Sequence, residues 1–173
     1  MSRIELRLIS LCLVLAFCNI ALQAEIPDGA RATSVSGGEN HTLVLTAAET
    51  VWACGDNSSY QLGIGNSTPQ GTLSQVLKGD MNSPTPYIAY IDAVDAGWKH
   101  SLVLDVNGFV WAWGNNDSGQ IGDSTDHTRT TPVGVHNPMG TGYFGNILSI
   151  SAGRSGEHSL AIDANDFVWA WGR

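Results

Sequence analysis

The chain has 173 residues, with 8 lysines and arginines against 16 aspartates and glutamates, so its formal net charge is −8. Hydrophobic residues make up 43% of the chain and charged residues 14%, which is the composition of a packed globular protein and not of a disordered chain. The acidic balance disfavours nucleic acid or an anionic membrane surface as the main partner, because both select basic patches.

Residues 1–24 have the layout of an export signal. Arg3 and Arg7 precede an apolar run from 8 to 17, and Ala24 is a small residue suited to a cleavage site. The apolar run is shorter than the roughly 20 residues that a membrane-spanning helix needs, so a cleaved signal is predicted and a membrane anchor is the alternative. Membrane contact would then be transient, and lipid anchoring at Cys18 stays an open alternative.

Removal of the leader would change the charge and the cysteine content of the chain. The remaining 173 − 24 = 149 residues carry 6 basic and 15 acidic side chains, a net charge of −9. Cys12 and Cys18 would leave with the leader, and Cys54, which stays, is expected to be buried. We expect an exported protein that resides in a periplasm, outside the cell or at the cell surface.

The rest of the chain repeats itself. Residues 41–63 (HTLVLTAAETVWACGDNSSYQLG) match residues 100–122 (HSLVLDVNGFVWAWGNNDSGQIG) at 12 of 23 positions without a gap. A third copy at 158–172 (HSLAIDANDFVWAWG) matches 100–114 at 11 of 15 positions. The leading histidines are 59 and 58 residues apart, and such a steady period indicates a repeat architecture.

Each copy predicts a β-hairpin. Residues 100–105 alternate and are rich in β-formers, 105–108 have turn chemistry, and 109–113 form an aromatic returning strand. An apolar stretch precedes the hairpin, as at 91–96 and 147–152, and a segment near 132–135 follows it. Four short antiparallel strands and no helix in about 58 residues predict an all-β fold made of β-propeller blades.

The propeller is predicted to be incomplete. At 58 residues a blade, 149 residues make about 2.5 blades, whereas closed propellers have at least four. We therefore expect the N-terminal fragment of a longer protein, and closure by self-association of several chains is the alternative. The expected divisions are a signal peptide (1–24), an N-terminal segment (25–34) and a partial propeller (35–173) with repeat cores at 38–63, 97–122 and 153–173.

The shared pattern is Gly-x-x-His-(Ser/Thr)-Leu followed by Val-Trp-x-(Trp/Cys)-Gly-x-Asn-x-x-x-Gln-(Leu/Ile)-Gly. It resembles the repeat of the regulator of chromosome condensation family over about 35–173, and the resemblance implies a seven-bladed propeller. The third copy departs from the pattern, because two extra residues precede its histidine and the chain stops before the Gln-Leu-Gly part. The structural repeat positions are Gly38, His41, Trp52, Gly55, Gln61 and Gly63, then Gly97, His100, Trp111, Gly114, Gln120 and Gly122, and finally Gly153, His158, Trp169 and Gly172.

Most of these positions are expected to be structural. Three histidines could suggest a metal site, but each occupies the same place in a different blade, which favours hydrogen bonds within or between blades. The repeated tryptophans are expected to pack the blades. Trp98 differs, because it lies in the Gly-x-x-His loop where the other copies carry Glu39 and Arg154, and it is the candidate residue for binding a partner.

No motif for catalysis is present, so no catalytic, cofactor-binding or metal-binding residue is predicted. The turns at 105–108 and 163–166 lack the alternating oxygen ligands and the closing glutamate of a calcium loop.

The sequence favours an exported, non-catalytic scaffold that binds another protein through loops at one rim of the propeller. The resemblance adds two alternatives: a secreted inhibitor of an extracellular enzyme, since the family includes inhibitors of β-lactamases, and guanine-nucleotide exchange on a small GTPase, as in the family's founder. The leader and the acidic charge oppose nucleotide exchange. A quinone-dependent dehydrogenase is the enzymatic alternative, because 104–111 resembles such repeats, although the Gly-x-x-His element is foreign to them.

Overall fold

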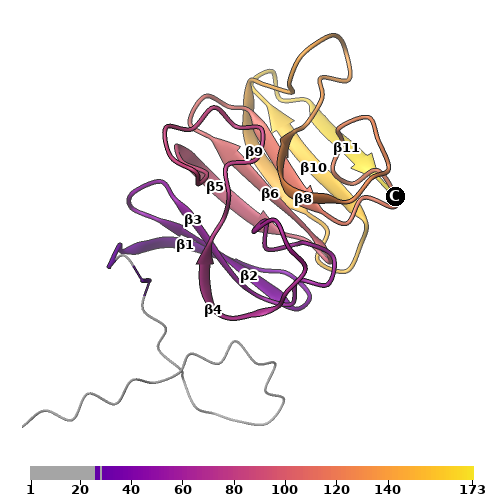
Figure 1. The fold of residues 1–173 in the computed structure, drawn as a ribbon. Coiled ribbons are helices and arrows are strands. Elements are labelled where there is room, and N and C mark those ends of the chain that lie inside the picture. Colours follow the sequence, from indigo (N-terminus) through magenta and orange to yellow (C-terminus); the bar gives the residue numbers. More distant parts are fainter. Residues whose placement is uncertain (1–25, 28) are drawn as a thin grey trace, which may run out of the picture.

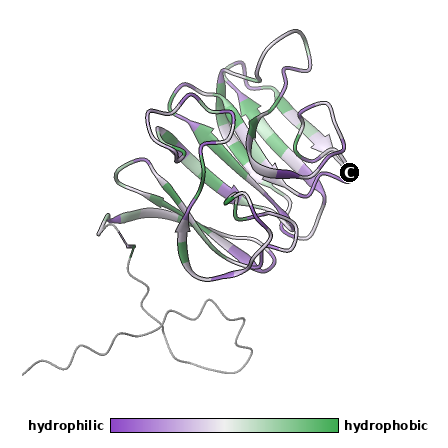
Figure 2. Cartoon of the chain, in the orientation of Figure 1, coloured by the Kyte–Doolittle hydropathy of each residue, from purple (hydrophilic) through white to green (hydrophobic). Residues whose placement is uncertain are grey.

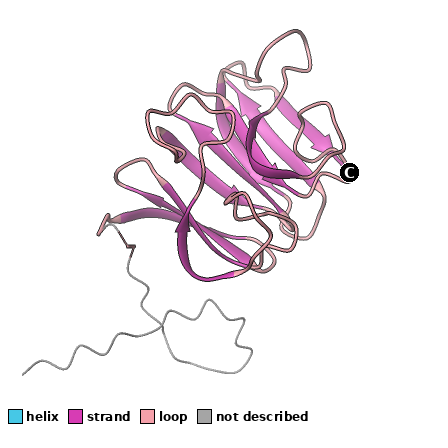
Figure 3. Ribbon diagram, viewed as in Figure 1, coloured by secondary structure: helices cyan, strands magenta, loops and turns pink. Residues whose placement is uncertain are grey.

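The computed structural model describes residues 26–27 and 29–173, so the predicted leader and Cys18 lie outside the described residues. Eleven strands form three antiparallel sheets in this part of the chain, and the links between them are loops and turns (Figures 1 and 3). None of the described residues belongs to a helix that could cross a membrane.

Each repeat forms one sheet, and the strands follow one another in sequence order across it. The first sheet contains β1 (Ala32–Gly37), β2 (His41–Thr46), β3 (Val51–Gly55) and β4 (Gln70–Gln75). The second contains β5 (Ile91–Ala96), β6 (His100–Asp105), β7 (Val110–Gly114) and β8 (Arg129–Gly134). The third contains β9 (Ile147–Ala152), β10 (His158–Asp163) and β11 (Val168–Gly172).

The predicted all-β fold of incomplete propeller blades is confirmed. The sheets lie side by side (Figure 1), and β5 contacts β1 of the first sheet and β9 of the third, so these first strands are the innermost strands of their blades. The first two blades have the predicted four strands and the third has three. The first sheet begins at Ala32, three residues before the boundary expected at 35.

The core lies between the sheets, because both faces of the middle sheet are apolar. One face, with Val103 and Trp111, packs against Leu43 of the first sheet. The other face, with Leu102 and Val110, packs against the third sheet. Alternation along each strand sends successive side chains to opposite faces, which is why one strand serves two interfaces. Figure 2 shows hydrophobic residues along the strands of the sheets.

The outer face of the first sheet is covered by the chain's own N-terminal segment. Ile26 packs against Val44 and Trp52, and Ala30 and Leu73 border the same cluster. A short segment before β1 thus takes the place that a neighbouring blade has elsewhere in the molecule.

Aspartate organises the hairpin turn of the second and third sheets. One carboxylate oxygen of Asp105 accepts hydrogen bonds from the backbone N–H groups of Asn107 (2.8 Å) and Phe109 (3.0 Å). Its other oxygen accepts the indole N–H of Trp111 at 2.9 Å. Asp163 repeats all three bonds in the third sheet. The two turns are therefore hairpin turns in which the aspartate also fixes the following tryptophan.

Candidate functional site

Two of the three repeated histidines, His41 and His100, lie at seams between blades. His41 Nε2 is 3.0 Å from the hydroxyl of Ser101 in the next blade, and that hydroxyl donates to the carbonyl of Gln61 at 2.8 Å. The second seam repeats the arrangement: His100 Nε2 is 3.1 Å from Ser159 Oγ, which donates to the carbonyl of Gln120 at 2.8 Å.

The direction of these bonds determines the form of the imidazole. A serine hydroxyl has one proton, and in each seam a carbonyl accepts it, so the histidine Nε2 must donate to the hydroxyl. His41 and His100 are therefore neutral with the proton on Nε2. Burial, with a smaller contribution from the histidine of the next blade, lowers the pKa of each ring to about 4.

This pairing of histidine with serine has no catalytic geometry. Ser101 and Ser159 are fully buried, so neither hydroxyl oxygen can reach a substrate. Each hydroxyl also donates its proton to a backbone carbonyl and not to a histidine that could act as a base. Across residues 26–27 and 29–173, no group of three or more His, Cys, Asp or Glu side chains could hold a metal ion. The seam histidines act as links between blades.

Tryptophan completes each seam. The indole N–H of Trp113 donates to the carbonyl of Gln61 at 2.8 Å, so this oxygen accepts from both Ser101 and Trp113. Trp171 makes the equivalent bond, at 2.9 Å, to the carbonyl of Gln120. A Cβ on Gly63 would lie 2.7 Å from the Trp113 indole nitrogen, and Gly63 also has a positive φ of 66°, so both space and backbone require glycine there.

The remaining polar residues of the motif stabilise the loop after the third strand of each blade. The Asn57 amide donates to the carbonyls of Asn66 (2.6 Å) and Thr68 (3.1 Å), and its oxygen accepts the N–H of Leu62 (3.0 Å). Asn116 repeats this pattern in the second blade. The motif thus describes how blades are built and joined.

The loop with Trp98 lies at one rim of the stack. Backbone hydrogen bonds connect the rim loops of successive blades: the N–H of Glu39 donates to Gly97 O (3.3 Å), and that of Trp98 donates to Gly153 O (2.8 Å). The Trp98 ring is half-buried, and the Lys99 ammonium lies 4.5 Å from its centroid, within the range of a cation–π interaction. A rigid backbone therefore presents an aromatic ring beside a positive charge.

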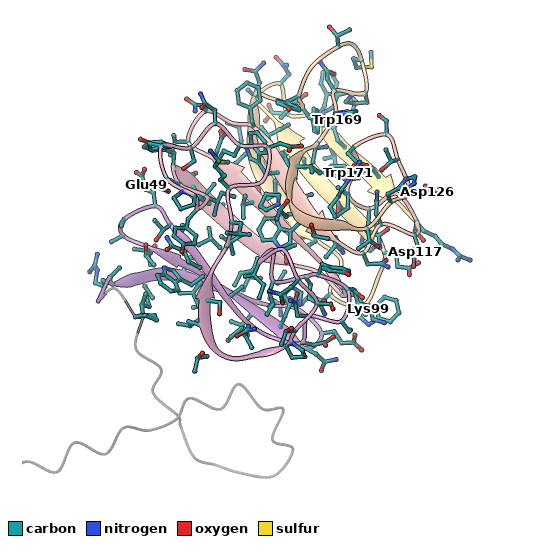
Figure 4. All side chains as sticks on the ribbon, in the orientation of Figure 1. Glu49, Lys99, Asp117, Asp126, Trp169 and Trp171 are labelled. Carbon is teal, nitrogen blue, oxygen red and sulfur yellow. The ribbon has the colours of Figure 1, made fainter. Side chains whose placement is uncertain are left out.

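The rim that carries Trp98 has charges of both signs. Lys99, Asp117 and Asp126 lie at this end of the strands, and Glu49 lies at the opposite end (Figure 4). Ser118 donates to the Glu157 carboxylate at 2.8 Å, which links the rim loops of the second and third blades. The rim thus combines one tryptophan with polar and charged side chains of both signs.

The rim carboxylate of Asp56 is held in its charged form. Burial alone would raise the pKa of Asp56, but hydrogen bonds from Ser58 and Gln61 outweigh it and lower the pKa below its usual range. A fixed negative charge therefore belongs to this rim over the physiological pH range.

The seam serines and the turn aspartates were not among the predicted structural positions. Ser101 and Ser159 directly follow the repeated histidines, and Asp105 and Asp163 end the same strand. Their recurrence at the same positions of the repeat could have marked them as structural residues. Their hydrogen-bond partners could not be predicted, because those partners lie in other blades or beyond a turn.

Comparison with known proteins identifies the family. Two models of the "Regulator of chromosome condensation (RCC1) repeat" match the chain, one at residues 32–61 and 91–120 and the other at 107–162, and together they cover more than half of it. The chain belongs to the regulator of chromosome condensation repeat family. The resemblance inferred from the sequence motif is confirmed.

Curated relatives share only the repeat region with this chain. Human "Probable E3 ubiquitin-protein ligase HERC4" is 35% identical over 98 residues, 57% of this chain and 9% of the relative. "RCC1 domain-containing protein RUG3, mitochondrial" from Arabidopsis thaliana is 31% identical over 141 residues, 80% of this chain and 28% of the relative. The chain thus spans less than a third of these relatives, and the similarity to ligases covers their repeats.

Solved structures show the same fold. Human WBSCR16 superposes with a TM-score of 0.69 at 23% identity, covering 83% of this chain and 33% of that chain. Yeast RCC1 (Prp20) in complex with Kap60 superposes with a TM-score of 0.63 at 23% identity, covering 82% of this chain and 32% of that chain.

Proposed function

We propose that this chain is an exported scaffold that binds another protein through the rim carrying Trp98. The observation that carries the proposal is Trp98 itself, a half-buried tryptophan at a place where the other two blades carry Glu39 and Arg154. A residue needed for the blade fold would recur with the repeat, whereas Trp98 does not.

The geometry of the rim suits protein recognition. Tryptophan is enriched among the residues that dominate binding energy at protein interfaces, and replacing such a residue costs at least about 2 kcal/mol of binding free energy. The hydrogen bond from the backbone N–H of Trp98 to the carbonyl of Gly153 holds the loop in place, which reduces the conformational entropy lost on binding. The charges of both signs at the same end of the strands would make the rim polar and help to orient the partner.

Relatives support binding of protein as the general class. Prp20p from Saccharomyces cerevisiae has been described with its binding properties to Gsp1p and histones, and yeast RCC1 has been solved bound to Kap60. Those partners belong to those proteins. For the present chain, the signal-like residues 1–24 and the net charge of −9 in the remainder favour a protein partner outside the cytoplasm.

The binding test compares two aromatic residues at opposite rims. Immobilised chain would capture partners from the envelope and extracellular fractions of the source organism, with Trp98→Ala as the test variant and Phe109→Ala as the matched control. Phe109 is 38% exposed in a turn at the other end of the strands. We expect Trp98→Ala to reduce capture at least about tenfold and Phe109→Ala to leave it unchanged. Loss with Phe109→Ala alone would place binding at the opposite rim and contradict the proposal.

Export is tested separately. Cell fractionation combined with N-terminal sequencing should recover the chain outside the cytoplasm, beginning at Glu25. Retention in the cytoplasm with an intact N-terminus would contradict export and leave the rim proposal standing.

A further inference from the structure

One rim loop of the first blade holds a tyrosine in a backbone conformation that suits glycine. Tyr60 has a positive φ of 62°, and its counterpart in the second blade is Gly119, with a φ of 77°. A positive φ is unfavourable for a bulky residue, because the Cβ atom then crowds the backbone. The second blade forms the same loop with glycine, so the half-buried side chain of Tyr60 points to a role other than building the blade.

The same loop carries a carboxylate that the second blade lacks. Asp56 accepts the side-chain N–H of Gln61 at 2.8 Å, and Asn115 accepts that of Gln120 at 2.6 Å in the same way. An amide oxygen therefore holds this loop as well as a carboxylate does. Asp56 thus places a negative charge where the second blade has a neutral side chain.

Tyr60 and Trp98 come from adjacent segments of neighbouring blades. A Cβ on Gly114 would lie 3.4 Å from Gln61 Cα and 2.6 Å from Lys99 O, so the two segments meet at this glycine. Tyr60 directly precedes Gln61, and Trp98 directly precedes Lys99. The two aromatic residues therefore belong to the first seam, on the same rim.

The second seam has the same backbone but other side chains. A Cβ on Gly172 would likewise clash with Glu157 O and lie 3.2 Å from Gln120 Cα. Gly119 and Arg154 stand there in place of the two aromatic residues. The departures from the repeat therefore coincide at the first seam, although both seams are built in the same way.

We propose that Asp56, Tyr60 and Trp98 form one binding surface across the first seam, and that this surface takes an arginine side chain of the partner protein. A guanidinium group stacks on aromatic rings and pairs with carboxylates, so a tyrosine and an aspartate from one loop suit it. Trp98 then contacts the residues beside that arginine. The inference rests on the proposed function, because it names the chemistry of the partner at the same rim.

The charge of the molecule favours a cationic partner. The residues after the predicted leader carry a net charge of −9, which attracts basic proteins and repels acidic ones. The Lys99 ammonium, 4.5 Å from the centroid of the Trp98 ring, already occupies that ring. The arginine of the partner is therefore assigned to Tyr60 and Asp56.

The test is a titration of short peptides into the full chain, followed by NMR. The probes are a peptide of glycine and serine with one central arginine, and the same peptide with glutamine in place of the arginine. We expect saturable shifts in the signals of Tyr60 and of the Trp98 indole with the arginine peptide. The glutamine peptide should bind at least about tenfold more weakly, because it cannot pair with a carboxylate.

Substitutions that copy the second seam test the assigned residues. Asp56→Asn and Tyr60→Gly introduce residues with which the second blade already folds, and each should weaken binding of the arginine peptide at least about tenfold. Tyr60→Phe keeps the ring and should bind like the unmodified chain. Glu49→Gln removes one negative charge at the opposite end of the strands (Figure 4) and should also leave binding unchanged.

Absence of saturable binding, equal binding of the two peptides, or unchanged binding in either Asp56→Asn or Tyr60→Gly would overturn the inference. It would also be overturned if capture of the natural partner were lost with Trp98→Ala but retained with Asp56→Asn, a result that leaves the proposed function standing. Capture that is unaffected by Trp98→Ala would contradict the proposed function instead, and the peptide titration would still decide whether the first seam takes arginine.

Discussion

The second and third sheets share a hairpin sequence but differ in burial. HSLVLDVNGFVWAWG and HSLAIDANDFVWAWG fold into the same paired strands. Val110 is completely buried, however, and its counterpart Val168 is 71% exposed. Trp113 is likewise completely buried, while Trp171 is partly exposed. The repeat sequence thus specifies a strand and its pairing, and the neighbouring blade decides how much of that strand is buried.

The two seams, in contrast, are nearly identical. His41 with Ser101 and His100 with Ser159 have Nε2 to Oγ distances of 3.0 and 3.1 Å, and each serine donates to a carbonyl of the preceding blade at 2.8 Å. The seam is therefore a property of two adjacent blades, and it forms wherever a second blade is present.

The largest predicted effect is the loss of unfolding free energy when a tryptophan is replaced, and this loss should differ between the second and third sheets. Trp113→Ala removes a fully buried ring and its bond to Gln61 O, and should cost about 3–5 kcal/mol of unfolding free energy. Trp171→Ala removes a partly exposed ring with the same bond, and should cost about half as much. Urea denaturation measures both, and equal losses would show that the third sheet is as well covered as the second.

Acid should weaken both seams together. The pKa of His41 and of His100 is about 4 in the folded chain against 6.5 for an ordinary histidine, so the unfolded chain binds more protons between these values. Each neutral histidine therefore makes its full contribution to the free energy of unfolding above about pH 6.5. That contribution falls as the pH drops toward 4, by up to about 3 kcal/mol for each ring.

Thermal denaturation between pH 7 and 4.5 measures this acid effect. His41→Gln should flatten the profile, and the exposed His127→Gln should leave it unchanged. A melting temperature that stays constant across this range in the unmodified chain would contradict the assigned neutral histidines.

Removal of the serine hydroxyl should lower the free energy of unfolding by the same amount in the two seams. Ser101→Ala leaves the His41 N–H without its acceptor, and Ser159→Ala does the same to His100. Because both serines are fully buried, each change should cost about 1–3 kcal/mol. Equilibrium unfolding of the two variants measures the costs, and a clearly smaller loss for Ser159→Ala would show that the second seam is weaker.

The smallest predicted effect is a gain in the first sheet. Among the described residues, the buried indole N–H of Trp52 has no hydrogen-bond partner, because Thr46 stands where the later blades have Asp105 and Asp163. Thr46→Asp supplies the missing acceptor and should stabilise the chain by about 0.5–1.5 kcal/mol. The reverse change, Asp105→Thr, should destabilise it, and a loss in both variants by urea denaturation would contradict this account.

Local features of the fold could be predicted from the sequence. The apolar stretches 91–96 and 147–152 are β5 and β9, and the segment near 132–135 overlaps β8, because alternation and turn chemistry act over a few residues. The period of about 58 residues predicted repeated blades, because each copy carries the same pattern of strands and turns. The sequence also marked Trp98 as an exception to the repeat.

Only the tertiary structure decided what each repeated residue contacts. The bond from Ser101 to Gln61 spans 40 residues and that from Trp113 to Gln61 spans 52, and no local pattern encodes such pairings. Exposure of Val168 and the half-buried state of Trp98 likewise depend on which sheet lies next to which. Secondary structure in this chain arises from short-range backbone preferences, whereas its interfaces arise from apolar faces brought together across whole blades.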